Sequence, residues 1–126
     1  MKINEFIKNN LRVINYSGNS SVHSPFPLLT SSRLPKIVCS DGFEMSVQVG
    51  SSLYSKPKKI AKRYSAVEIG FPSDHEPLIE EYAENFFEEE PNYTDTVYPY
   101  VPVGVVDKVL KKHGGINLTQ TLLEAE

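Results

Sequence analysis

The side chains best suited to chemistry in this chain are five cations at positions 56–63: Lys56, Lys58, Lys59, Lys62 and Arg63. Lysine supplies a compact point charge and arginine a planar fork of donors, so this run could form the rim of a phosphate-binding site. Tyr54 precedes the run and could add an aromatic surface. The alternative interpretation is an exposed loop whose charges are only solvated.

Residues suited to the rest of a nucleotide-like ligand lie further along the chain. Phe71 can stack on a base, and Ser73 can donate a hydrogen bond to a phosphate or ribose oxygen. Asp95 and Thr96 could bind ribose hydroxyls, and Tyr98 could pack against a second ring. The candidate ligand-binding residues are therefore Tyr54, Lys58, Arg63, Phe71, Pro72, Ser73, Asp95, Thr96 and Tyr98.

Candidate catalytic and metal-binding residues lack the spacing that such chemistry requires. His23, His75 and His113 lie in unrelated contexts, and no zinc-binding pair, nucleophile elbow or phosphate loop is present. Asp74-His75-Glu76 could supply metal ligands, but adjacent side chains rarely point at one ion, so a solvated turn is favoured. Cys39 has no neighbouring base and is expected to be a core or edge thiol. We expect a protein that is not an enzyme and has no metal or cofactor.

The acidic segment 80–90 has two interpretations. A run of glutamates is usually a solvated surface, and Phe86 and Phe87 within it would then belong to the core or to an interface. The functional alternative is a mimic of nucleic-acid charge, or a face that binds another protein.

Composition limits the class of protein. A chain of 126 residues with 40% hydrophobic residues is expected to form one domain with a real core. The net charge of −3 argues against binding to a nucleic acid polymer but not against a small anion held by local cations. A single cysteine excludes an intrachain disulfide, and no segment is typical of a signal peptide or a membrane span. We expect a cytoplasmic protein.

The first half of the chain predicts a helix, a long loop and a hairpin. Residues 2–10 carry apolar side chains at helical spacing, and residues 15–35 are rich in Ser, Asn and Pro. So long a loop suggests either an arm that reaches a neighbouring subunit or a flexible segment. Residues 36–40 and 43–49 flank Asp41-Gly42, a dipeptide typical of a type I′ turn, and the second arm alternates apolar and polar residues.

The second half predicts two further strands and two helices. Residues 64–71 form a strand ended by Pro72, and Pro77 begins a helix with one acidic face. The prolines in 95–101 restrict that strand to an edge position, with Tyr98 and Tyr100 on one face. A final helix follows Pro102, with Val106, Val109 and Leu110 facing inward, and stops near residue 113, before a tail at 116–126. The fold class is α+β, with a small antiparallel sheet opened by a β-hairpin; residues 1–35 form a helix and arm, and 36–115 the core.

A set of short motifs between residues 36 and 115 resembles a known group of proteins. The motifs are Tyr64-Ser-Ala-Val-Glu-Ile-Gly-Phe-Pro-Ser73, Glu76-Pro-Leu78, Tyr82-Ala-Glu84, Thr94-Asp-Thr-Val-Tyr98, Tyr100-Val-Pro102 and Lys112-His-Gly-Gly115. In combination they resemble small phage and prophage proteins that include the anti-Thoeris family. Members of that family act as sponges for cyclic ADP-ribose signals.

The resemblance implies a binding role inside the infected bacterial host. A bacterial TIR-domain protein makes a glycocyclic ADP-ribose signal, and the sponge binds it before an NADase effector is activated. Such sponges resemble symmetric oligomers with the ligand at a subunit boundary, so at least a dimer is expected. Phe71 would stack on adenine, and Arg63 and Lys58 would face the diphosphate. The relatives have an arginine where this chain has Lys58, so the resemblance does not identify which cation would bind the phosphates.

Two rival functions remain. The first is a protein-binding inhibitor of a host defence enzyme that uses the acidic 80–90 face. The second is a hydrolase of the same messenger, which is disfavoured because no general base with a partner is evident in the sequence.

Overall fold

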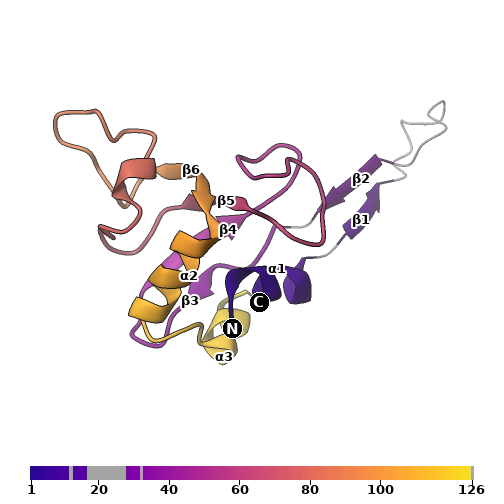
Figure 1. The fold of residues 1–126 in the computed structure, drawn as a ribbon. Coiled ribbons are helices and arrows are strands. Elements are labelled where there is room, and N and C mark those ends of the chain that lie inside the picture. The colour runs from indigo at the N-terminus through magenta and orange to yellow at the C-terminus, as the bar shows by residue number, and fades with distance from the viewer. Residues whose placement is uncertain (12, 17–27, 32, 126) are drawn as a thin grey trace.

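The computed structural model describes residues 1–11, 13–16, 28–31 and 33–125. Its centre is a four-stranded antiparallel sheet in the order β3-β4-β5-β6, so each strand pairs with the next one along the chain. The strands are Ile37–Val38, Glu44–Gln48, Ala66–Gly70 and Val97–Pro102. The three α-helices α1, α2 and α3 span Ile3–Asn10, Val103–Lys112 and Leu118–Glu124. The expected α+β class is confirmed (Figure 1).

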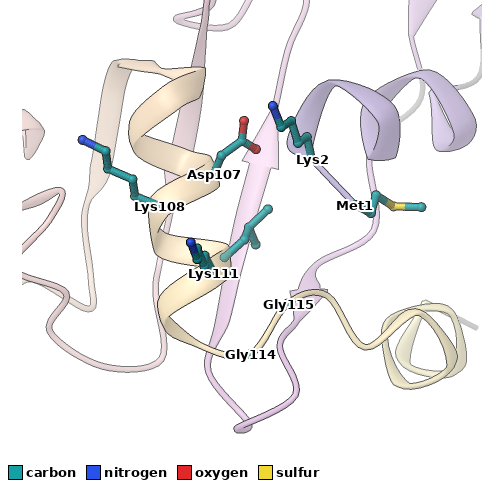
Figure 2. A pocket seen from close by; sticks show the side chains of 8 residues that line it. Met1, Lys2, Asp107, Lys108, Lys111, Gly114 and Gly115 are labelled. Atoms are coloured by element: carbon teal, nitrogen blue, oxygen red, sulfur yellow. The ribbon is translucent and has the colours of Figure 1, made fainter.

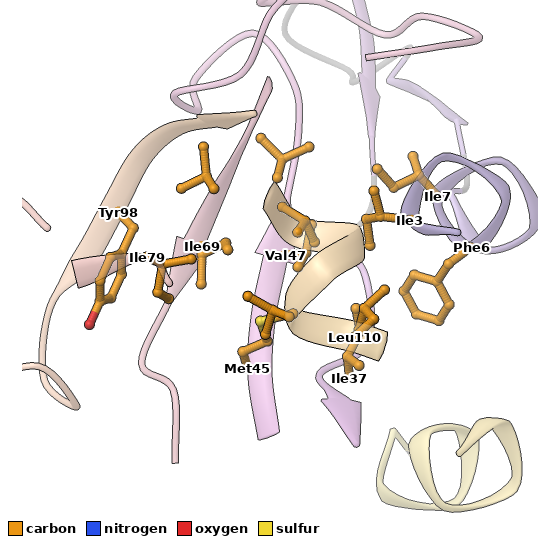
Figure 3. Packing of buried hydrophobic residues seen from close by; sticks show 14 of the residues in the cluster. Ile3, Phe6, Ile7, Ile37, Met45, Val47, Ile69, Ile79, Tyr98 and Leu110 are labelled. Atoms are coloured by element: carbon orange, nitrogen blue, oxygen red, sulfur yellow. The ribbon is translucent and has the colours of Figure 1, made fainter. Parts of the chain in front are cut away.

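The core lies between the helices and one face of the sheet. Figure 3 shows Met45, Val47 and Ile69 of the sheet beside Leu110 of α2 and Ile3 of α1. The apolar periodicity of α1 and α2 correctly identified their buried faces, because residues three and four apart share a helix side. The Asn4 side chain also fastens α1 to the chain before β5, through 2.9–3.0 Å hydrogen bonds with the Tyr64 backbone.

The hairpin of β3 and β4 forms where it was predicted, but its turn type differs. Gly42 has a φ of +95°, whereas Asp41 is not among the described residues with positive φ, and a type I′ turn needs both. The Gly42 amide donates to the Cys39 carbonyl, and the Cys39 amide donates to the Phe43 carbonyl. This pattern is a type I turn followed by a glycine bulge, so the type I′ prediction is wrong.

The alternating pattern of β4 predicts one buried face and one face toward water, and only the buried face is correct. Ser46 and Gln48, which were expected to face water, are buried at 6% and 7% exposure. The chain at Leu34 crosses over them, because the Gln48 amide group accepts from the Leu34 amide and donates to the Leu34 carbonyl, each at 2.9 Å. The Gln48 side chain therefore replaces water as the hydrogen-bonding partner of the buried Leu34 backbone.

A β-bulge in the last strand separates Tyr98 from Tyr100. Val67 pairs with Val101 and Ile69 pairs with Tyr98, so two residues of β6 stand opposite Glu68 of β5. Tyr100 takes a φ of +54°, and Tyr98 is fully buried in the core. The prediction that the two tyrosines share a face is therefore wrong, because the extra residue breaks the two-residue period. The edge position of β6 is confirmed.

Three further segments differ from their predicted structure. The helix expected after Pro77 is only a 3₁₀ turn at Glu80–Tyr82, since Ala83 is extended and the Glu84 amide donates to Val97 of β6. The expected tail contains α3, whose Thr121 hydroxyl accepts from the Val38 amide at 2.9 Å. The ends of the expected loop 15–35 pair as β1 (Val13–Tyr16) and β2 (Leu28–Ser31), and residues 17–27 lie outside the described part.

Candidate functional site

A groove of about 190 Å³ lies on the sheet face opposite the core. Its lining combines backbone from the end of β5 with polar side chains of β4 and β5 and with loop residues. These are Arg33, Ser46, Gln48, Leu53, Glu68, Gly70, Phe71 and Val97.

Phe71 forms one end of this groove with an exposed ring. Its side chain is 43% exposed, and its backbone has a φ of +48°. The left-handed region is unusual for a bulky residue and is strained. The Phe71 amide donates to the Thr96 carbonyl at 3.0 Å, which ties the strained residue to the start of β6. The Phe71 side chain therefore leaves the core at the end of β5.

A cluster of cations and aromatic rings follows Leu53 along the chain, and its four side chains lie outside the lining of the groove. The Lys58 ammonium is 5.2 Å from the centroid of the Tyr54 ring, and the Lys56 ammonium is 5.5 Å from that of Tyr100. The two rings lie 5.7 Å apart at an angle of 59°. The bulge in β6 brings this cluster together, because it lets the Tyr100 amide donate to the Tyr54 carbonyl. Cations over ring faces keep both ammonium groups at the surface, where an anion can reach them.

Glu68 lines the groove and lies on β5 between Phe71 and the bridge of Ala66 to Lys56, and it was missed by sequence reasoning. Burial raises the pKa of Glu68, the Tyr54 backbone hydrogen bond opposes that rise, and the Glu84 charge adds to it. The Arg33 and Lys58 charges also oppose the rise, but the pKa of Glu68 stays above its ordinary value. A groove with one carboxylate beside cations can accept hydrogen bonds from hydroxyls as well as attract anions. The sequence did contain a signal for this role, because Glu68 is the one charged residue within the apolar run of β5.

The other candidate residues divide into accessible and inaccessible groups. Arg63 and Asp95 are exposed, whereas Pro72 is buried and Thr96 is 9% exposed. The Ser73 hydroxyl accepts from the Glu44 amide at 2.8 Å and keeps its own proton to donate.

Tyr98 belongs to the core and does not line the groove. Its hydroxyl donates to the Tyr93 carbonyl, and its side chain is fully buried. Burial, with smaller contributions from Tyr93 and Glu80, raises the pKa of Tyr98 to about 12. A ring in this position cannot pack against a ligand in the groove.

A separate charged cluster joins three distant segments, and sequence reasoning missed it. The His113 ring bonds Asp41 at 2.6 Å through Nδ1 and Glu76 at 2.7 Å through Nε2, and it stacks on Phe43 at 4.1 Å. Lys112 also donates to Glu76 at 3.0 Å. The expected solvated turn at 74–76 is wrong for Glu76, which is 1% exposed. Its partners replace the water that a buried carboxylate loses.

This cluster is built for structure rather than for proton transfer. Both nitrogens of the His113 ring are occupied by carboxylates, so neither is open to a substrate. Burial raises the pKa of Glu76, but hydrogen bonds from Leu78, His113 and Lys112 outweigh it and hold this pKa below its ordinary value. The cluster fastens the β3–β4 turn to the end of α2.

The remaining reactive groups are placed as follows. Cys39 is buried, and burial together with the nearby Asp41 charge raises the pKa of its thiol to about 11. His75 is exposed, bonds Glu80 at 2.6 Å and stacks on Tyr93 at 4.2 Å.

Within the described residues, no group of three or more His, Cys, Asp and Glu side chains is arranged to hold a metal ion. None of the described helices has the length and apolar composition that crossing a bilayer requires.

Comparisons of this chain with models of protein families, with curated proteins and with solved structures found no match.

Proposed function

We propose that this chain is a phage-encoded sponge that binds and sequesters a cyclic ADP-ribose-type messenger and so blocks TIR-based Thoeris defence. The observation that carries the proposal is the exposed Phe71 ring, which is held in a strained backbone conformation and lines a groove. A cluster of cations over aromatic rings lies next to Leu53 of the same groove. Strained residues that the surrounding structure holds in place are concentrated at ligand-binding sites.

The groove offers a partner for each part of such a messenger. Phe71 stacks on adenine, and Lys58 faces the diphosphate near the Tyr54 ring. Glu68 accepts hydrogen bonds from ribose hydroxyls in the centre of the groove. Of the residues assigned from sequence, Arg63 and Asp95 remain available at the surface, whereas Tyr98 is withdrawn from the proposal because it is buried.

The size of the groove favours a site shared between subunits. A volume of about 190 Å³ is small beside the roughly 300–1,000 Å³ of typical small-molecule pockets. One chain would therefore cover only part of a dinucleotide-sized ligand, and a second chain would enclose the rest. This argument supports a homo-oligomer, at least a dimer, with the messenger at the boundary.

A single experiment tests the function against its rivals. The protein is incubated with the messenger, separated from unbound ligand and heated, and the supernatant is assayed for effector activation. Intact messenger released by heating supports the sponge, and degraded messenger would instead show a hydrolase. Messenger that never binds would leave the alternative of a protein-binding inhibitor.

One observation favours that alternative enough to keep it. The loop that contains the acidic segment exposes 95% of the Phe87 side chain, and an aromatic ring among glutamates is suited to a protein contact. Co-purification of a host defence enzyme with the protein, lost when Phe87 is replaced, would favour this function over the sponge.

A further inference from the structure

A second and larger pocket lies on the helical side of the molecule, away from the groove. It has a volume of about 560 Å³ and is formed by the start of α1 and the last turns of α2 (Figure 2). We call it the basic pocket, and its lining residues are Met1, Lys2, Asp107, Lys108, Leu110, Lys111, Gly114 and Gly115.

The basic pocket has more positive than negative charge. Lys2 and Lys111 contribute ammonium groups, whereas Lys108 lines the pocket with its stem and its ammonium points away from Lys2 and Met1 (Figure 2). None of the three lysines takes part in an ion pair between described residues. Its one carboxylate, Asp107, accepts the Ile3 amide at 2.8 Å and so caps the first turn of α1. Met1 adds apolar surface. The chemistry of this pocket suits an acidic segment that also carries an apolar side chain.

The acidic loop, residues 84–92, has that composition. Phe87 is 95% exposed, and Glu88, Glu89 and Glu90 after it are all exposed. None of these glutamates takes part in an ion pair between described residues.

The loop is also held in shape before any partner arrives. The Asn85 side chain donates to the Asn92 carbonyl at 3.1 Å across its base, and Phe86 supports Phe87 edge-on at 5.2 Å. A segment that is already ordered loses less entropy on binding.

We propose that the acidic loop of one copy docks into the basic pocket of a second copy, with Phe87 over Met1 and the glutamates facing the lysines. The loop projects from the β6 end of the sheet, on the side away from α1, so the two surfaces of one chain do not meet (Figure 1). The contact is therefore head-to-tail, and each copy uses two different surfaces. The occupant is a second copy because its acidic loop is complementary in charge to the basic pocket. Every chain carries both surfaces, so the two are always present at equal concentration.

Complementation between two variants tests this interface. The pocket variant is Lys2→Glu with Lys111→Glu, and the loop variant is Phe87→Ala with Glu88→Lys and Glu89→Lys. All five side chains are exposed, so both variants should keep the wild-type melting temperature. In light scattering each variant alone should have a smaller mass than the wild type, since each lacks one half of the contact.

An equimolar mixture should then form a 1:1 complex, because it retains one intact loop and one intact pocket. The wild-type association should weaken roughly tenfold at high salt, as expected for complementary charges at a surface. The control is Lys59→Glu with Lys62→Glu, which makes the same change in charge on another exposed surface and should leave the mass unchanged. Three outcomes would overturn the proposal. They are a wild-type mass of 14.2 kDa at all concentrations, a variant with the mass of the wild type, and a mixture that forms no complex. A monomeric wild type would also count against the shared site of the proposed function. The other two outcomes concern this interface alone and leave the sponge function standing.

Discussion

The amide of Phe71 donates a 3.0 Å hydrogen bond to the carbonyl of Thr96, and this bond holds the Phe71 ring at the end of the groove. Gly70 before it is buried, and a Cβ atom there would lie 3.8 Å from Ser46 and from Val97. The φ of +48° at residue 71 turns the chain outward, so a phenyl ring is presented to solvent at the cost of a strained backbone.

Replacing Phe71 with Ala should weaken messenger binding without unfolding the protein. Stacking on an aromatic ring contributes about 1–3 kcal/mol per base, so one to two decades of affinity should be lost. Calorimetric titration and a thermal melt of the same variant measure both effects. Leu78→Ala is the matched control, because Leu78 is 39% exposed and lies outside the groove. A large fall in melting temperature with normal binding would show that Phe71 serves only the core.

Binding of the messenger should be reversible and should weaken with salt. The Lys58 ammonium is exposed beside Tyr54, and charges at a surface are screened over about 8–10 Å at physiological ionic strength. Lys58→Ala should lower the affinity and reduce its dependence on salt in a calorimetric series, whereas Lys8→Ala on α1 should change neither. An affinity that does not vary with salt would show that these cations are merely solvated.

Replacing Glu76 with Gln should destabilise the fold at neutral pH by about 1–3 kcal/mol, because it removes a charged acceptor from Lys112 and His113. The folded-state pKa of Glu76 lies below its ordinary value. Its contribution is therefore complete above the unfolded-state pKa and is lost as the pH falls through the folded-state pKa. Denaturant unfolding at several pH values should show a wild-type loss of stability in acid that is smaller in Glu76→Gln. Parallel curves for the two proteins would contradict this role.

The Cys39 thiol should be unreactive in the native protein. A pKa of about 11, against an ordinary value of 9.0, lowers the thiolate fraction at neutral pH about a hundredfold. Alkylation followed by mass spectrometry should show slow modification of the folded protein and rapid modification after denaturation. Rapid modification of the folded protein would mean that β3 opens easily.

Part of the candidate site could be predicted from local sequence, and part could not. The exposed Phe71 follows from its place before Pro72, and the cations near Tyr54 follow from the run that begins at Lys56. Glu68 as the centre of the groove, and Tyr100 as a partner of Lys56, depend on the pairing of β5 with β6. Strand pairing with a bulge is a property of two segments, so the pattern of either segment alone did not reveal it.

The sequence by itself determined the α+β class, the hairpin at Asp41-Gly42, and the buried faces of α1 and α2, because turn preference and apolar periodicity are local properties. Only the tertiary structure decided that Asp41, Glu76 and His113 meet, since each comes from a different segment. It also decided that Tyr98 is core while Phe71 is surface. Both are aromatic residues beside a proline, and their exposure depends on the bulge and the left-handed turn that aim their side chains in opposite directions.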